Sequence, residues 1–454
     1  MHQRRSANYR PNLWKYDFLQ SLNNSYDLKE GTKEQVERLV EEVKPTLSEA
    51  VNSLLKLELI DKMKKLGLSN LFGNEIKEVL QTVASTNNGV FNMEDHLYAS
   101  ALQFRLLRQH GHVVSQDALR SFRDGRNTLS GSNCGDVEAM IELLEASYLA
   151  MEGENILEEA KAFSTGILQE RVSGLDGQLL KRAVHALELP MHWRVQWFDI
   201  KWQIDLYEQQ EDKQSSLLQL AKLNFNIVQA THQRDLRDIS RWWRDLGLIE
   251  HVDFARDRLV ESFFCALGLS QEPQFSSFRK SLTKVIILIL VIDDLYDLYG
   301  SLEELECFTD AITRWDLEQI QQLPECIKVC FQALRDVTYE IAHEIGKDED
   351  WHQVAERERG DAPSSVACYM REANVSEDIA RKHITILINQ AWNSINAHCF
   401  GNAEKPFLRP FINVTVNAAR VVHMLYQFGD GFAIPDGDIQ RQILSIVIKP
   451  LALD

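Results

Sequence analysis

An uninterrupted apolar run, residues 285–292, leads directly into three aspartates, Asp293, Asp294 and Asp297. Such a short run with β-branched side chains is compatible with either a buried strand or a buried helix, and it is too short to cross a membrane. In a helix, Asp293 and Asp297 share a face, whereas Asp294 points about 100° away from Asp293. Carboxylates at the C-terminal end of a buried helix repel each other and oppose the helix dipole.

A divalent cation would relieve both of these costs. Mg²⁺ in particular is held by one or two carboxylates and completes its octahedron with water and substrate phosphates. The aspartates therefore predict a Mg²⁺ site that receives a diphosphate, with Mn²⁺ as the alternative oxygen-binding ion. The competing interpretation is that the acidic residues only end the helix in water.

The composition describes a globular protein with little glycine or proline. The chain has 454 residues, of which 44% are hydrophobic, 21 are Gly and 10 are Pro, and its net charge is −18. This charge disfavours nucleic acid and anionic membranes as partners. No convincing hairpin signal occurs, so we expect an all-α protein. Helical periodicity recurs at residues 76–83, 140–151, 179–189 and 217–230.

Three further features bear on organisation and location. The acidic stretch 208–212 is a candidate linker, which predicts an N-terminal domain over residues 1–213 and a C-terminal domain over 214–454. The seven cysteines are scattered without a Cys-x-x-Cys pair, so we expect reduced thiols. The first residues carry no secretory or transit signal, which predicts a cytoplasmic protein, or a plastid one if a transit peptide has been lost.

Arg256 and Arg258 lie a short way upstream of the aspartates. Arginine makes bidentate contacts to phosphate and stays charged at any working pH, so this pair would hold a diphosphate from the side opposite the metal. The alternative is an ordinary surface ion pair with Asp257.

Several motifs then follow one another in an order that resembles the plant class I terpene synthases. The motifs, in chain order, are Arg4-Arg5 with Trp14, Arg256-Asp257-Arg258, Asp293-Asp294-Leu-Tyr-Asp297, Arg359-Gly360-Asp361, and Tyr426 with Asp430. The resemblance covers nearly the whole chain and implies that residues 285–292 form a buried helix. It also implies two helical domains: an N-terminal helical barrel and a C-terminal class I terpenoid-synthase bundle.

The resemblance also implies an activity. Residues 5–22, 185–198 and 444–450 are most similar to family members that form α-farnesene. It implies a monomeric sesquiterpene synthase that ionises farnesyl diphosphate with Mg²⁺ and deprotonates the allylic cation to an acyclic product such as α-farnesene. The implied metal ligands are Asp293, Asp294, Asp297 and Glu356. The implied catalytic residues are Arg256, Asp293, Asp297, Tyr426 and Asp430. The implied substrate-binding residues are Arg256, Arg258, Asp293, Asp297 and Cys265.

The chain departs from the family pattern at residues 354/355. The segment up to Val354 resembles the middle of the catalytic domain, whereas the segment from Ala355 resembles the end of the second metal-binding motif. Of that motif only Glu356 survives, and we interpret the match at Asp348 as coincidence. The resemblance therefore implies a C-terminal domain that lacks several helices, and a form with little or no activity.

Two alternatives remain open. Arg4, Arg5 and Trp14 are typical of monoterpene synthases, which use geranyl diphosphate, although the absent transit peptide opposes that reading. The other alternative is a catalytically dead member of the family. The lack of an Asp-x-Asp-Asp motif excludes protonation-initiated class II chemistry, and a single Asp-Asp-x-x-Asp distinguishes the chain from chain-elongating prenyltransferases.

Overall fold

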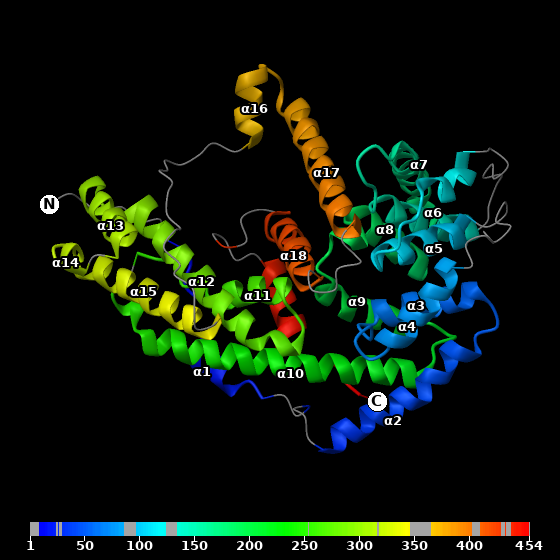
Figure 1. The fold of residues 1–454 in the computed structure, drawn as a ribbon, viewed down its shortest axis with the longest axis horizontal. Coiled ribbons are helices and arrows are strands. Elements are labelled where there is room, and N and C mark those ends of the chain that lie inside the picture. Colours follow the sequence, from blue (N-terminus) through cyan, green and yellow to red (C-terminus); the bar gives the residue numbers. More distant parts are fainter. Residues whose placement is uncertain are drawn as a thin grey trace. The chain divides into compact units, whose positions relative to one another are not determined.

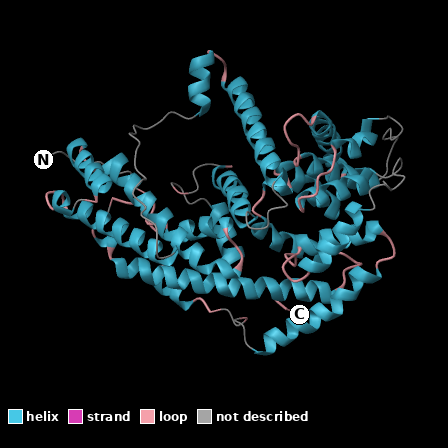
Figure 2. Cartoon of the chain, in the orientation of Figure 1, coloured by secondary structure: helices cyan, strands magenta, loops and turns pink. Residues whose placement is uncertain are grey.

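The computed structural model describes residues 9–23, 26, 30–85, 97–123, 134–252, 254–315, 317–345, 365–401, 409–427, 432 and 437–453. Across these ranges the regular structure is helical and no strand is found (Figures 1 and 2), which confirms the predicted all-α class. None of the described helices is long and apolar enough to span a membrane.

The helices run in sequence along the chain, with two π-helical turns among them. In order they are α1 (Tyr16–Ser21), α2 (Glu30–Glu49), α3 (Ser53–Lys65), α4 (Gly73–Ser85), α5 (Leu97–Gln109), α6 (Cys134–Ser147), α7 (Asn155–Arg171), α8 (Gly177–Glu188), α9 (Gln196–Glu208), α10 (Ser215–Leu246), α11 (Leu259–Leu269), α12 (Ser276–Asp294), the π-helix η6 (Leu295–Tyr299), α13 (Leu302–Arg314), α14 (Leu317–Ile320), α15 (Glu325–Ile345), α16 (Ser365–Ala373), α17 (Glu377–Gly401), α18 (Arg409–Tyr426), α19 (Gly437–Ile443) and the π-helix η8 (Leu444–Ile448).

Contacts divide the chain into two compact units. Unit 1 contains residues 1–27, 227–364 and 425–450, and unit 2 contains residues 28–226, 365–424 and 451–454. Residues 365–424, which the sequence places after the boundary at 213/214, therefore pack with residues 28–226. The units describe packing, whereas the predicted boundary concerns sequence modules, so that boundary stays a prediction.

In unit 1, α12 carries the apolar run and packs against α11 and α15 (Figure 1). Its buried side chains include Ile287, Leu288 and Val291, which lie on one face at helical spacing, whereas Ile289 is 59% exposed. Arg279 near its start is buried and bonded to the Asp235 carboxylate on α10. This one-sided burial explains why the run forms a helix, as the family resemblance implied.

In unit 2, α5, α7 and α8 pack around α6. Residues 365–424 are anchored here through His192 and Trp193. The indole of Trp193 stacks on Trp392 of α17 with ring centroids 5.2 Å apart. His192 Nε2 lies 2.8 Å from Asn396 Oδ1, and Arg420 Nε donates to His192 O at 2.8 Å.

The N-terminal half of α17 has a different environment from its anchored half. Ile379, Ile386 and Leu387 are 52%, 54% and 45% exposed, and Phe411 at the start of α18 is 72% exposed. Large apolar side chains exposed at several positions of consecutive helices mark a surface that a partner or a further element would cover. This pattern agrees with a C-terminal region that lacks helices.

Candidate functional site

Arg256 and the aspartates at the end of α12 form one connected group in unit 1. The Arg256 backbone N–H donates to Asp294 Oδ2 at 2.8 Å, and its Nε donates to the same oxygen at 3.2 Å. Its Nη2 donates to Asp293 Oδ2 at 2.7 Å and lies 3.0 Å from Asp294 Oδ1. Burial lowers the pKa of Arg256, but Asp294 and its neighbours raise it by more, so the guanidinium is held charged.

The two adjacent aspartates lie on different faces of the helix. The Asp294 side chain is 1% exposed and turns inward to Arg256, whereas the Asp293 side chain is 52% exposed. Asp297 is also exposed, one turn further along. The turn that carries it is the π-helix η6, and such rare turns are frequent at functional sites.

The exposed carboxylates fit the implied divalent ion. Asp293 and Asp297 offer hard oxygen ligands to solvent, and Mg²⁺ needs only one or two such carboxylates beside water and phosphate oxygens. Across the described ranges, however, no group of three or more His, Cys, Asp or Glu side chains is arranged to hold a metal. The Asp294 carboxylate accepts bonds from Arg256 and Tyr9, and its role as a metal ligand stays a prediction.

Arg258 is engaged with backbone carbonyls. It is 1% exposed, and it donates from Nε to Phe432 O at 3.0 Å and from Nη2 to Arg10 O at 2.9 Å. In this arrangement Arg258 fastens two distant chain segments together. Its predicted contact with a diphosphate stays a prediction.

A residue that the sequence analysis left without a role also belongs to this group. The Tyr9 hydroxyl donates to Asp294 Oδ1 at 2.8 Å, and Arg256 Cζ lies 5.1 Å from the Tyr9 ring centroid. Burial, and then the bond to Asp294, raise the pKa of Tyr9 to about 12. No pattern in the sequence indicates this contact, because the two residues are 285 positions apart.

The other predicted site residues are placed as follows. Cys265 on α11 is 9% exposed, and burial raises the pKa of its thiol to about 12, so the thiol is protonated and unreactive. Tyr426 ends α18 and is 55% exposed. Arg4, Arg5, Glu356, Asp430 and the junction at 354/355 lie outside the described residues.

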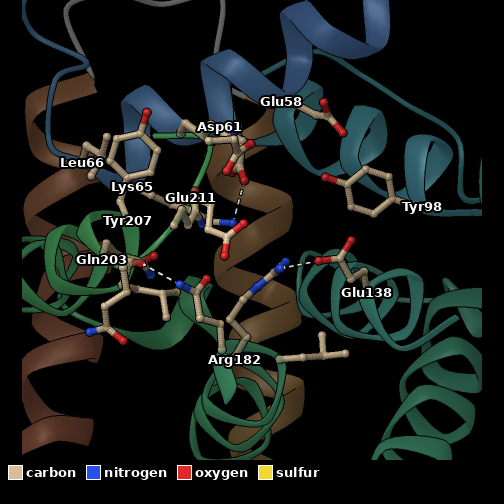
Figure 3. A pocket seen from close by; sticks show the side chains of 17 residues that line it. Glu58, Asp61, Lys65, Leu66, Tyr98, Glu138, Arg182, Gln203, Tyr207 and Glu211 are labelled. Atoms are coloured by element: carbon tan, nitrogen blue, oxygen red, sulfur yellow. Dashed lines mark hydrogen bonds and ion pairs between the residues drawn. The ribbon is translucent and has the colours of Figure 1, made fainter. Parts of the chain in front are cut away.

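Unit 2 contains a cavity of about 760 Å³ between α3, α5, α6, α8 and α9 (Figure 3). Its charged groups largely satisfy one another: Lys65 Nζ lies 2.6 Å from Asp61 Oδ2, and Arg182 Nη1 lies 2.5 Å from Glu138 Oε1. Burial raises the pKa of Asp61, yet Arg105 and Lys65 lower it by more, so the carboxylate stays ionised. This polar, internally paired cavity is unsuited to a long hydrocarbon chain.

Sequence profiles of two families match the chain. The profile described as "Terpene synthase, N-terminal domain" matches residues 13–187, and the profile described as "Terpene synthase family, metal binding domain" matches residues 244–355 and 348–394. Together the matches cover most of the chain. The protein belongs to the terpene synthase family.

Similar relatives include farnesene synthases and a thujene synthase. An alpha-farnesene synthase of Ricinus communis is 44% identical over 100% of this chain and 97% of the relative, and an (E,E)-alpha-farnesene synthase of Malus domestica is 43% identical over 99% and 95%. A chloroplastic alpha-thujene synthase of Litsea cubeba is 38% identical over 98% of this chain and 92% of the relative.

Two solved structures have the same helical fold. A limonene synthase with 2-fluorolinalyl diphosphate superposes with a TM-score of 0.90 at 32% identity, covering 99% of this chain and 100% of the other. An isoprene synthase from grey poplar leaves, in complex with three Mg²⁺ ions and dimethylallyl-S-thiolodiphosphate, superposes with a TM-score of 0.84 at 33% identity, covering 97% and 99%.

The length of the sequence alignment bears on the predicted loss of helices near residues 354/355. The alignment with the Ricinus communis protein extends over 548 positions, 94 more than the 454 residues of this chain, so at least that many aligned positions are gaps in this chain. Because the alignment reaches across the whole chain, these gaps are internal. The metal-binding profile matches in two pieces that meet at residues 348–355, which agrees with the predicted junction.

Proposed function

We propose that this chain is built as a sesquiterpene synthase that ionises farnesyl diphosphate and releases an acyclic product such as α-farnesene. The observation that carries the proposal is the Arg256 guanidinium held between a buried Asp294 and an exposed Asp293. This arrangement presents one firmly anchored cation beside a carboxylate that is free to turn to solvent. The farnesene-forming relatives support the choice of substrate.

In this proposal Asp293 and Asp297 would hold Mg²⁺, which would supply positive charge to stabilise the leaving pyrophosphate. With the Asp293 carboxylate on the ion, Arg256 Nη2, which now pairs with Asp293, would be available to a diphosphate oxygen. The Nε and backbone N–H of Arg256 stay on Asp294, so the guanidinium keeps its position. A donor that is already in place needs no reorganisation as charge develops on the leaving group.

The final step of the proposed reaction is a deprotonation. The allylic cation loses a proton, and pyrophosphate itself is the proposed base, with Tyr426 and Asp430 shaping that end of the site. Cys265 in place of an aromatic residue supports an acyclic product, because it offers little cation–π stabilisation to a cyclising cation. A cytoplasmic monomer remains part of the proposal.

A second candidate is a monoterpene synthase that acts on geranyl diphosphate. It is favoured by the similarity to the chloroplastic alpha-thujene synthase and by the Arg4, Arg5 and Trp14 pattern. The choice between the two substrates concerns the depth of the hydrocarbon pocket rather than the diphosphate end.

We further propose that this 454-residue form has little or no activity. Of the second metal-binding motif the chain retains only Glu356. Because the other ligands of that motif are missing, Glu356 should bind a metal ion poorly. Fewer cations leave more uncompensated charge on the leaving pyrophosphate. Each tenfold loss in rate corresponds to about 1.4 kcal/mol of barrier. We expect the loss of a metal ion to raise the barrier by several such steps.

Product analysis with two purified forms tests the proposal. The 454-residue chain and a version that carries the missing segment at 354/355 are each incubated with Mg²⁺ and either farnesyl or geranyl diphosphate. We expect α-farnesene from the completed version with farnesyl diphosphate and little product from the short chain. Preferred turnover of geranyl diphosphate would establish the second candidate. An inactive completed version would identify a dead relative, and robust turnover by the short chain would refute the proposed loss of activity.

A further inference from the structure

The segment that contains Tyr9 is fixed in register on the loop before α11. Arg258 Nη2 donates to Arg10 O at 2.9 Å, and Asn12 Nδ2 donates to Asp257 Oδ2 at 2.7 Å. The Asp257 carboxylate also accepts a bond of 3.1 Å from Trp243 Nε1 on α10. These bonds follow one another along the chain, so the position of Tyr9 is determined by neighbours that do not themselves contact the aspartates of α12.

Tyr9 contacts both members of the buried pair. Its hydroxyl donates to Asp294 Oδ1 at 2.8 Å, the same oxygen that lies 3.0 Å from Arg256 Nη2. Its ring lies beside the guanidinium, with 5.1 Å between the ring centroid and Arg256 Cζ. The Tyr9 hydroxyl and the outer nitrogen of Arg256 therefore share one carboxylate oxygen.

We propose that Tyr9 is a positioning residue for diphosphate binding, and this inference rests on the proposed function. By donating to Asp294 Oδ1, the hydroxyl satisfies part of the charge on that oxygen and weakens its hold on Arg256 Nη2. The outer edge of the guanidinium is then free to face a diphosphate, while Nε and the backbone N–H remain anchored on Oδ2. Without the hydroxyl, Asp294 draws Nη2 inward and competes with the ligand.

Calorimetry with inorganic pyrophosphate and Mg²⁺ tests this role on the chain as it exists. Tyr9→Phe keeps the ring beside Arg256 and removes only the hydroxyl, and we expect it to weaken pyrophosphate binding about tenfold. The matched control is Tyr16→Phe in the same segment, whose ring lies 3.9 Å from Arg244 Cζ. We expect this control to bind as the unaltered chain does.

A double-mutant cycle separates positioning from a general structural effect. If Tyr9 acts through Asp294, Tyr9→Phe should change pyrophosphate affinity by less than about twofold in the Asp294→Asn background. Unchanged affinity of Tyr9→Phe in the unaltered background, or an undiminished effect in the Asp294→Asn background, would overturn the role of Tyr9 alone. Failure of the unaltered chain to bind pyrophosphate with Mg²⁺ would instead overturn the diphosphate site proposed at Arg256, Asp293 and Asp297, and the role of Tyr9 with it.

Discussion

Replacement of Asp294 by alanine should destabilise unit 1 far more than the same replacement of its neighbour Asp293. The Asp294 carboxylate accepts bonds from the Arg256 backbone N–H, from Arg256 Nε and from the Tyr9 hydroxyl. Its removal leaves a guanidinium that is 9% exposed without its buried counter-ion. The Asp293 carboxylate is 52% exposed and pairs with the outer edge of the same guanidinium.

The two environments predict different magnitudes. Removing one partner of a buried ion pair costs about 3–5 kcal/mol, whereas an exposed pair contributes about 0–1 kcal/mol. For a cooperative unit of roughly 150–250 residues, 1 kcal/mol lowers Tm by about 2–4 °C. We therefore expect Asp294→Ala to lower the Tm of unit 1 by about 6–20 °C, and Asp293→Ala to lower it by no more than a few degrees.

Scanning calorimetry of the unaltered chain and the two variants measures this difference. Asp294→Asn serves as the isosteric control, because it keeps an acceptor for the Arg256 backbone N–H but removes the charge. We expect its Tm to lie between those of the unaltered chain and Asp294→Ala. Equal Tm values for Asp294→Ala and Asp293→Ala would refute the buried anchoring role of Asp294.

Other consequences are open to simpler measurements. Asp293→Ala and Asp297→Ala should each lower Mg²⁺-dependent pyrophosphate affinity at least about tenfold by calorimetry, because two carboxylates share one ion; a double variant with unchanged affinity would rule out the metal assignment. Burial holds the pKa of His192 at about 3 against an ordinary 6.5. The unfolded chain therefore binds a proton that the folded chain excludes, and stability should fall as the pH drops from about 6.5 toward 3. Denaturant titration of His192→Gln should show a flatter acid limb, and an equally steep one would contradict this assignment. The exposed Ile386 and Leu387 should make the folded chain bind the dye ANS, and completing the chain at 354/355 should reduce that fluorescence; equal signals would show that other surface binds the dye.

Much of the fold and part of the site could be predicted from the sequence. Helical periodicity and the scarcity of glycine and proline indicated the all-α class. The order of the motifs identified the family. At 354/355 the resemblance passes directly from the middle of the catalytic domain to the end of the second metal-binding motif, which indicated an internal loss. The length of the alignment supports this loss. Helix geometry alone separated Asp293 from Asp294, because adjacent residues point about 100° apart.

Other features could not be predicted from any local pattern. The run at 285–292 was equally compatible with a strand, and only its burial on one face against α11 and α15 accounts physically for the helix. The π-helical turn at Leu295–Tyr299 has no recognisable sequence signature, because it forms where the chain leaves the packed helix α12.

The sequence by itself determined which chemical groups are present: the aspartates, the arginines and the order in which they occur. The tertiary structure decided which of them meet. Tyr9 reaches Asp294 across 285 positions, and His192 anchors Asn396 across 204. Such contacts depend on the path of the whole chain. Closing a long loop costs conformational entropy, and the packing of the elements between its ends offsets that cost. For that reason the inward-facing partner of Arg256 became visible only in the folded chain.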